Sequence, residues 1–351
     1  MKNMETKKRV VMVDFWSVCD ENGKPIGHGG KVGNEYYGYI RDDYNVVQYV
    51  NDSMLQHLDN PKKTAFSNSL KHNYSKWKRV LTNFRCLNEV YRKEADSTIW
   101  FYVPDIYLFL FILLMPKGKR RIIVNVYEEY IGSKAKHWIF KQALKKIDKV
   151  FVTNKLLLKS IPEGILIPDY AYNEEVYSKY QSPEKKEQAV CLGTMNEKKQ
   201  LVEAVEVFSK NGYPLYIAGQ FSSKDKYAQL CNMKSNNISI ENRFVDFDEY
   251  YRLLASSKYC LIPYDAEFYK NRTSGVIQEC LFCNTIPITH KDILAFANIE
   301  GMGYTDIEEL SEIDLRLPDI NEFQISYAAE RDRFYRYEVI KRKIVEAFVG
   351  E

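Results

Sequence analysis

Short apolar runs alternate with amphipathic segments along the second half of the chain. Each apolar run is long enough for a buried strand, and each amphipathic segment repeats its apolar positions with helical spacing. We predict strands at 189–195, 214–220, 238–245, 258–264 and 285–289, with helices at 199–210, 225–235, 246–256 and after 273. Such alternation predicts a parallel sheet covered by helices, with ligands at the carboxyl ends of its strands.

The first half is less regular but follows the same pattern. Strands are predicted at 9–15, 97–103, 122–130 and 149–154, and helices at 51–95, 106–115 and 134–146. The helix at 106–115 is very apolar but only half as long as a membrane span, which leaves a buried core helix or an interfacial anchor. A chain of 351 residues exceeds what one hydrophobic core supports, so two α/β domains are expected.

The segment 271–289 carries the strongest chemical signal. Thr273, Ser274 and Gly275 fall where a helix begins, so we expect a hydroxyl cap and free N–H groups suited to phosphate. Arg272 lies beside this point and can make a two-pronged contact with phosphate oxygens. Glu279 is a single carboxylate in an otherwise apolar helix, where it could accept two neighbouring ribose hydroxyls.

Together with 191–208, this segment resembles the second domain of GT-B glycosyltransferases, most closely the family 4 type. The matching positions are Gly193, Glu197, Lys198, Ser274, Gly275 and Glu279. The resemblance implies that Lys198 and the helix start bind the donor diphosphate and that Glu279 holds its ribose. It also implies that the donor pocket includes Gly219, Phe244 and Val245, and Thr194 where the family has arginine.

One difference from the family pattern concerns catalysis. Asn271 stands eight positions before Glu279, where the family has a first glutamate, and Glu267 or Asp265 could reach the same place. Arg272 could supply the charge that Thr194 lacks. Family 4 members retain the configuration of the transferred sugar. Whether this chain does so therefore stays open.

The resemblance implies domains at 1–170 and 189–326, a linker at 171–188, and a last helix at 327–351 that returns to the first domain. The first strand is followed by a glycine-rich loop, in which Gly29 and Gly30 would approach the donor. His28 could act there as a base, although an ordinary loop histidine explains it as well. Glu128 and Glu129 follow a buried strand and are candidates for the acceptor site, or one of them caps the next helix.

The implied activity is transfer of a sugar, most simply from a UDP-sugar, to a glycan or lipid-linked acceptor in surface polysaccharide synthesis. No cofactor and no metal is expected, because cationic side chains and the helix start neutralise the leaving diphosphate. A non-catalytic partner subunit with this fold and a nucleotide-sugar epimerase are the alternatives.

Charge and cysteine content refine this picture. Residues 1–160 contain 28 Lys and Arg against 16 Asp and Glu, whereas the remainder contains 22 against 31. The first half therefore suits an anionic partner, such as the inner membrane surface, rather than nucleic acid, for which no motif is present. Seven cysteines without a regular framework indicate a reducing, cytoplasmic setting, and Cys280 and Cys283 are expected to be buried packing residues.

Overall fold

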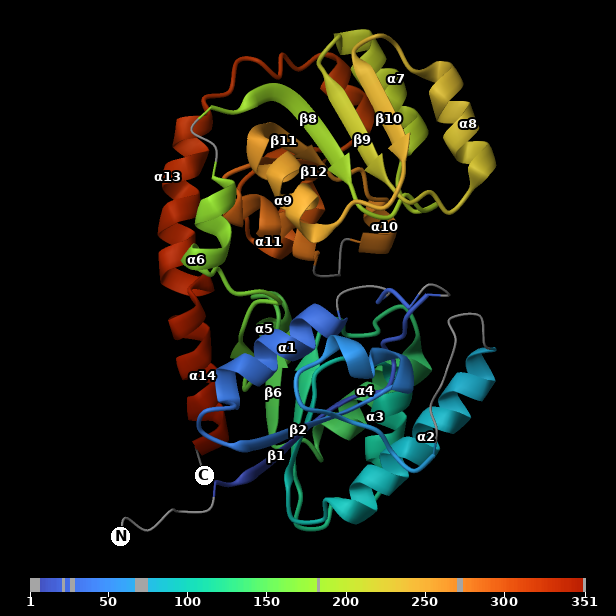
Figure 1. Cartoon of the computed structure of the whole chain (residues 1–351), viewed down its shortest axis with the longest axis vertical. Coiled ribbons are helices and arrows are strands. Elements are labelled where there is room, and N and C mark those ends of the chain that lie inside the picture. The colour runs from blue at the N-terminus through green and yellow to red at the C-terminus, as the bar shows by residue number, and fades with distance from the viewer. Residues whose placement is uncertain are drawn as a thin grey trace. The chain divides into compact units, whose positions relative to one another are not determined.

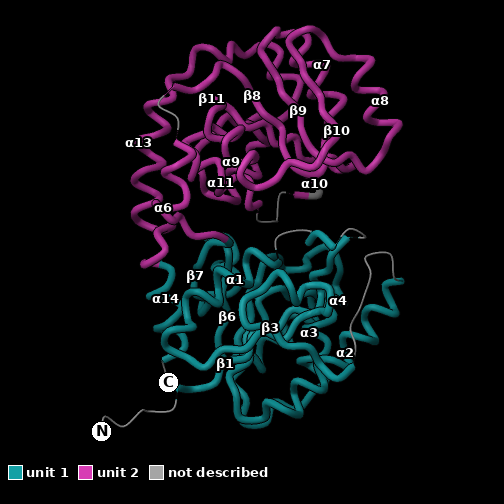
Figure 2. The backbone as a smooth tube through the Cα atoms, in the orientation of Figure 1, with its two compact units in different colours: residues 1–169, 340–351 teal, residues 170–339 magenta. Residues whose placement is uncertain are grey.

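Two parallel β-sheets form the cores of two units of the chain. The computed structural model describes residues 7–20, 23–25, 29–66, 75–181, 184–269 and 274–349. One unit comprises residues 1–169 and 340–351, and the other comprises residues 170–339 (Figure 2). The segment predicted as a linker, 171–188, thus belongs to the second unit, and the chain crosses between the units at 169–170 and again at 339–340.

The sheet of the first unit has seven strands in the order β3-β2-β1-β4-β5-β6-β7, and all neighbouring strands are parallel. The strands are β1 (Arg9–Asp14), β2 (Asn45–Val50), β3 (Pro61–Lys62), β4 (Thr98–Phe101), β5 (Arg121–Val126), β6 (Lys149–Val152) and β7 (Ile165–Leu166). The helices are α1 (Gly29–Ile40), α2 (Lys76–Lys93), α3 (Ile106–Leu114), α4 (Lys134–Leu144) and α5 (Leu157–Ser160), with α14 (Tyr337–Val349) from the end of the chain (Figure 1).

One face of this sheet is covered by α2, α3 and α4, which lie side by side. Phe111 of α3 packs edge-on against Phe84 of α2, with ring centroids 5.5 Å apart. Phe109 of α3 meets Phe140 of α4 in the same way at 5.0 Å. The apolar helix predicted at 106–115 is therefore mainly a core helix, and no described helix is long and apolar enough to cross a membrane.

The other face is covered by α1 and α14. Trp100, in the middle of β4, stacks on Tyr36 of α1 at 4.9 Å and meets Phe348 of α14 at 5.4 Å. Arg121 donates to the carbonyl oxygens of Ala347 and Phe348, at 2.7 and 2.6 Å. These contacts explain why the last residues of the chain belong to the unit that contains its first strand.

The sheet of the second unit has six parallel strands in the order β10-β9-β8-β11-β12-β13. The strands are β8 (Lys186–Leu192), β9 (Leu215–Gly219), β10 (Ile238–Asn242), β11 (Ser257–Leu261), β12 (Ile286–His290) and β13 (Met302–Tyr304). The helices are α6 (Glu174–Tyr177), α7 (Leu201–Asn211), α8 (Lys224–Met233), α9 (Phe247–Ser256), α10 (Ala266–Tyr269), α11 (Gly275–Phe282), α12 (Lys291–Ala297) and α13 (Ile320–Glu330). The predicted alternation of strands and helices is confirmed, and α12 and β13 are additional.

Each sheet has one place where the strand order changes direction. In the first unit it lies between β1 and β4, and in the second between β8 and β11. The loops that leave the carboxyl ends of these strand pairs turn to opposite sides, which opens a crevice in which open α/β sheets bind ligands. These two places are called here the first and the second switch point.

Candidate functional site

The loops after β8 and β11 are joined to each other at the second switch point. The amide of Gln200 donates to the carbonyl oxygen of Pro263 at 2.8 Å, and the amide of Asp265 donates to that of Lys198 at 3.0 Å. Between these bonds, Lys199 and Tyr264 form an isolated antiparallel bridge. The pairing fixes the backbone of both loops, so the side chains that they carry have defined positions.

Lys199 is buried in this junction, with only 7% of its surface exposed. Its ammonium group donates to the carbonyl oxygen of Leu192, the last residue of β8, at 3.2 Å. It also lies 5.8 Å from the centre of the Tyr264 ring. Among the described residues no carboxylate forms an ion pair with it, so this buried charge lacks an anion.

Tyr264 connects Lys199 to the start of α11. Its ring stacks on that of Tyr269 at 3.8 Å, and the side chain of Ser274 lies close enough to offset part of the effect of burial on the pKa of its hydroxyl. Burial is the main cause that raises the pKa of Tyr264, so the phenol stays protonated at neutral pH. A cation and a helix start therefore lie near each other at the second switch point.

Ser274 occupies the N-cap position of α11, as predicted, but its side chain does not cap the helix. Its hydroxyl makes no hydrogen bond to a helix N–H group, so the expected cap is wrong. Without a side-chain cap, the first N–H groups of α11 are suited to an anion.

The three glycines of the second unit that were predicted for the donor pocket have different structural reasons. Gly193 has φ +93°, a conformation that favours glycine, and Thr194 beside it is exposed. A methyl group on Gly219 would lie 1.7 Å from the Gly193 carbonyl oxygen. A methyl group on Gly275 would lie 2.4 Å from the Tyr170 ring, so packing rather than close approach of a ligand accounts for this glycine.

Glu279 lies in α11 and is only 3% exposed. Its two oxygens accept hydrogen bonds from the hydroxyls of Tyr250 and Tyr251 in α9, at 2.9 and 2.8 Å. Burial, followed by the nearby Glu279 carboxylate, raises the pKa of both tyrosines. The carboxylate thus holds a pair of hydroxyls, but those described here are tyrosine hydroxyls, and its contact with ribose stays a prediction.

The loop after β10 lies at the same edge of the sheet, two strands from β8. The Arg243 amide donates to the carbonyl oxygen of Gly219 at 3.1 Å, which joins this loop to the end of β9. The Arg243 guanidinium is held by Glu249 through two contacts of 2.6 Å. Phe244 is 47% exposed and Val245 is half-buried.

Lys198 and Glu267, predicted for catalysis, are exposed side chains at the second switch point. Lys198 belongs to the loop after β8 and Glu267 to α10, and neither is buried as Lys199 is. Arg272, Thr273 and His28 lie outside the described residues.

The remaining predicted residues belong to the first unit. Gly29 and Gly30 lie in the first turn of α1, so the expectation of a loop at these two positions is wrong. A methyl group on Gly29 would lie 1.9 Å from the Ser17 hydroxyl oxygen, which explains why glycine begins the helix. Glu128 is half-buried just after β5, and α4 is capped by Ser133 rather than by a glutamate.

Asp14 is a buried ionisable group at the first switch point. It ends β1, is buried, and accepts hydrogen bonds from the amides of Trp16 and Ser17 at 2.9 and 3.0 Å. Burial raises its pKa, against the effect of these bonds.

Sequence reasoning missed Lys199, Tyr264 and the pair of tyrosines on Glu279. One signal was present: Lys199 lies at the start of the amphipathic segment predicted as a helix, just after an apolar strand, where the chain leaves the core.

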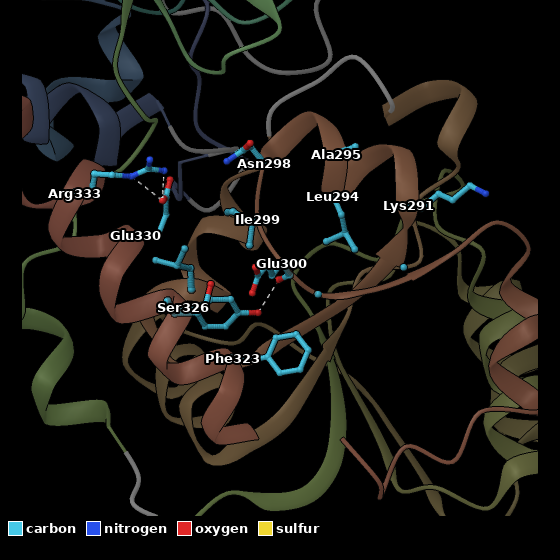
Figure 3. A pocket seen from close by; sticks show the side chains of 14 residues that line it. Lys291, Leu294, Ala295, Asn298, Ile299, Glu300, Phe323, Ser326, Glu330 and Arg333 are labelled. Atoms are coloured by element: carbon cyan, nitrogen blue, oxygen red, sulfur yellow. Dashed lines mark hydrogen bonds and ion pairs between the residues drawn. The ribbon is translucent and has the colours of Figure 1, made fainter. Parts of the chain in front are cut away.

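A groove of about 980 Å³ lies elsewhere on the second unit, along α12 and α13 (Figure 3). Leu294 and Phe323 line it, and Glu330 accepts hydrogen bonds from Arg333 at its rim. It includes none of the predicted site residues. No group of three or more His, Cys, Asp or Glu side chains suited to a metal is present in the described parts of the chain.

Comparison with known proteins identifies the fold. No protein-family model matches the chain, and no curated protein sequence matches it. Among solved structures, AviGT4, a glycosyltransferase involved in avilamycin A biosynthesis, is 12% identical over 97% of both chains, with a TM-score of 0.55. HepE of Anabaena, solved with UDP and glucose, is 12% identical over 97% of this chain and 99% of its own, with a TM-score of 0.66.

A putative UDP-N-acetylglucosamine 2-epimerase from Listeria monocytogenes is also similar. It is 9% identical over 98% of this chain and 96% of its own, with a TM-score of 0.61. These likenesses, together with the two parallel sheets and the returning last helix, show that the chain has the GT-B fold.

Proposed function

We propose that this chain is a cytoplasmic glycosyltransferase that takes a sugar from a nucleoside-diphosphate sugar, most simply a UDP-sugar. The observation that carries the proposal is the buried Lys199 ammonium, which no described carboxylate neutralises, near the start of α11. A diphosphate supplies the missing negative charge, and the uncapped N–H groups of α11 give it directional hydrogen bonds. HepE, solved with UDP and glucose, supports this choice of donor.

The proposed chemistry is electrostatic. Cleavage of the bond between sugar and diphosphate leaves negative charge on the leaving phosphate, and fixed donors aimed at that charge lower the barrier. Lys199 would act there, with Lys198 and Arg272 as further cations. These cations would neutralise the charge on the leaving phosphate, which a metal ion neutralises in other transferases. Transfer is therefore expected to continue in excess EDTA.

The rest of the donor has candidate contacts on the same edge. Phe244, exposed beside Val245 and Gly219, could stack on the base, and Glu279 could accept ribose hydroxyls beside those of Tyr250 and Tyr251. The acceptor is proposed to be a glycan or a lipid-linked sugar of a surface polysaccharide. Glu128 is the candidate base for it, and transfer is proposed to retain the configuration.

The decisive experiment is calorimetric titration of the full chain with UDP, GDP, CDP and ADP, and with UMP to test the second phosphate. One diphosphate is expected to bind, UMP more weakly, and Lys199→Met to lose most of the difference between UDP and UMP. If no nucleoside diphosphate binds at millimolar concentration, the proposal fails and a non-catalytic partner subunit becomes the better explanation.

A nucleotide-sugar 2-epimerase is the second candidate, because the Listeria protein shares the fold. The two functions differ in what the bound donor becomes. An epimerase that is given UDP-N-acetylglucosamine converts it into a second nucleotide sugar, and no acceptor is needed. A transferase releases UDP and needs an acceptor for rapid turnover, so product analysis with and without acceptor distinguishes them.

A further inference from the structure

Two helices of the first unit carry large apolar side chains that face solvent. Trp77 and Leu81, one turn apart near the start of α2, are 72% and 62% exposed. Ile131 precedes α4, and Trp138 lies in its second turn with 58% of its surface exposed. Exposed tryptophans are unusual on a soluble surface, and two of them close to helix starts require a reason.

These side chains lie along one edge of the unit. A helix that connects two parallel strands runs antiparallel to them, so α2, α3 and α4 all begin at the carboxyl edge of the sheet. The contacts of Phe111 with Phe84 and of Phe109 with Phe140 keep α2 and α4 on the two sides of α3 (Figure 1). The exposed apolar residues thus follow the same rim, called here the α2–α4 rim.

The rim is basic. The first turn of α2 contains three Lys or Arg and the first turn of α4 contains two lysines, and neither first turn contains an acidic residue. Exposed lysines thus flank the apolar side chains: Lys78 beside Trp77, and Lys134 one turn before Trp138.

Tryptophan and lysine on one rim match the two layers of a membrane surface. The indole ring is favoured at the boundary between headgroups and acyl chains, and lysines are attracted by anionic headgroups. We propose that the α2–α4 rim docks on an anionic lipid bilayer, with Trp77, Leu81, Ile131 and Trp138 inserted at the interface and Lys78 and Lys134 over the headgroups. This surface belongs to the first unit alone, so the proposal stands independently of sugar transfer.

Vesicle binding by the full chain tests the proposal. Vesicles of phosphatidylcholine with about 30% phosphatidylglycerol are expected to capture the protein at low salt and to release it at high salt, because the attraction is screened. Vesicles of phosphatidylcholine alone should capture little. Tryptophan emission should shift to the blue on binding, and the shift should shrink in Trp77→Phe and Trp138→Phe, because the other tryptophans are less exposed.

Two pairs of matched variants locate the surface. Leu81→Ser should weaken vesicle binding, whereas Leu317→Ser, which changes an 80% exposed leucine of the second unit, should not. Lys78→Glu combined with Lys134→Glu should lower the partition coefficient at least about tenfold, since each lysine near the surface contributes to attraction. All four changes lie in exposed positions, and glutamate suits the start of a helix, so folding is preserved.

The control for the charge pair is Lys224→Glu combined with Lys291→Glu. Both lysines are exposed first residues of helices, α8 and α12, in the second unit. Equal losses in the control and in the rim variant would overturn the proposal, as would equal capture by neutral vesicles or no capture at low salt. Salt-dependent binding of RNA or DNA without capture by vesicles would assign the rim to nucleic acid instead.

Discussion

The two switch points occupy the same place in two similar sheets but hold different buried ionisable groups. At the first, the buried group that ends β1 is Asp14, whose carboxyl accepts two backbone N–H groups. At the second, the buried group after β8 is Lys199, whose ammonium donates to one carbonyl oxygen. The fold therefore provides two crevices, and we propose that the anionic donor binds at the second.

The difference also extends to how well the buried polar groups are paired. Near the second switch point, Tyr250 and Tyr251 both donate to Glu279. Near the first, the hydroxyl of Tyr102, which follows β4, has no hydrogen-bond partner among the described residues. The Tyr102 side chain is fully buried, so this hydroxyl is an internal polar group and not a ligand contact.

The largest effect is expected at Lys199. Lys199→Met keeps the length of the side chain but removes the charge, and loss of one fixed donor to a developing oxyanion lowers turnover by about a hundredfold to a thousandfold. Turnover is measured with the nucleotide sugar that binds best. The fold should persist, because replacing a buried charge by an apolar side chain of similar size is seldom destabilising.

The neighbouring Lys198 gives the matched comparison. It is exposed, so Lys198→Met is expected to lower turnover less than Lys199→Met. If Lys198→Met has the larger effect, the exposed lysine is the one that meets the phosphate, and the buried Lys199 is structural.

How far the sequence predicts this molecule depends on the range of the interactions. The strands at 9–15, 97–103, 189–195 and 258–264 are predictable because buried parallel strands are continuous apolar runs. The start of α1 at Gly29 is not, because glycine indicates a loop locally and only the approach of Ser17 shows why it begins a helix. Helix α12 and strand β13 are short and carry too weak a pattern.

The candidate site was predictable in place but not in detail. The segment from Ser274 to Glu279 was placed by its own composition, and the helix is present there. The choice between Lys198 and Lys199 depends on a bridge to Tyr264, which is 65 positions away and leaves no local pattern. The partners of Glu279 come from α9, 28 and 29 positions earlier, and are equally invisible to helical spacing.

The next expected effect is on the pH dependence of stability, and it arises in the first unit. Burial, followed by the charge of Glu35, raises the pKa of Asp169 to about 7, and its Oδ1 atom is buried without a described partner. Because the folded protein binds this proton more tightly than the unfolded chain, stability decreases as pH rises from 4 towards 7. Between pH 5 and pH 8 the loss is on the order of 2 kcal/mol. Chemical denaturation of Asp169→Asn should lack this component, and an unchanged pH profile would contradict it.

The smallest expected effect is on the free energy of unfolding when one tyrosine hydroxyl is removed from each unit. Tyr251→Phe removes a hydroxyl that donates to Glu279 at 2.8 Å, and the loss of this bond to a buried carboxylate should lower the free energy of unfolding by about 1–3 kcal/mol. Tyr102→Phe removes a buried hydroxyl without a described partner, so stability should stay within about 0.5 kcal/mol or increase. Urea denaturation measures both. A Tyr102→Phe protein that is as destabilised as Tyr251→Phe would show that the Tyr102 hydroxyl is hydrogen-bonded in solution, and the contrast in pairing between the two switch points would disappear.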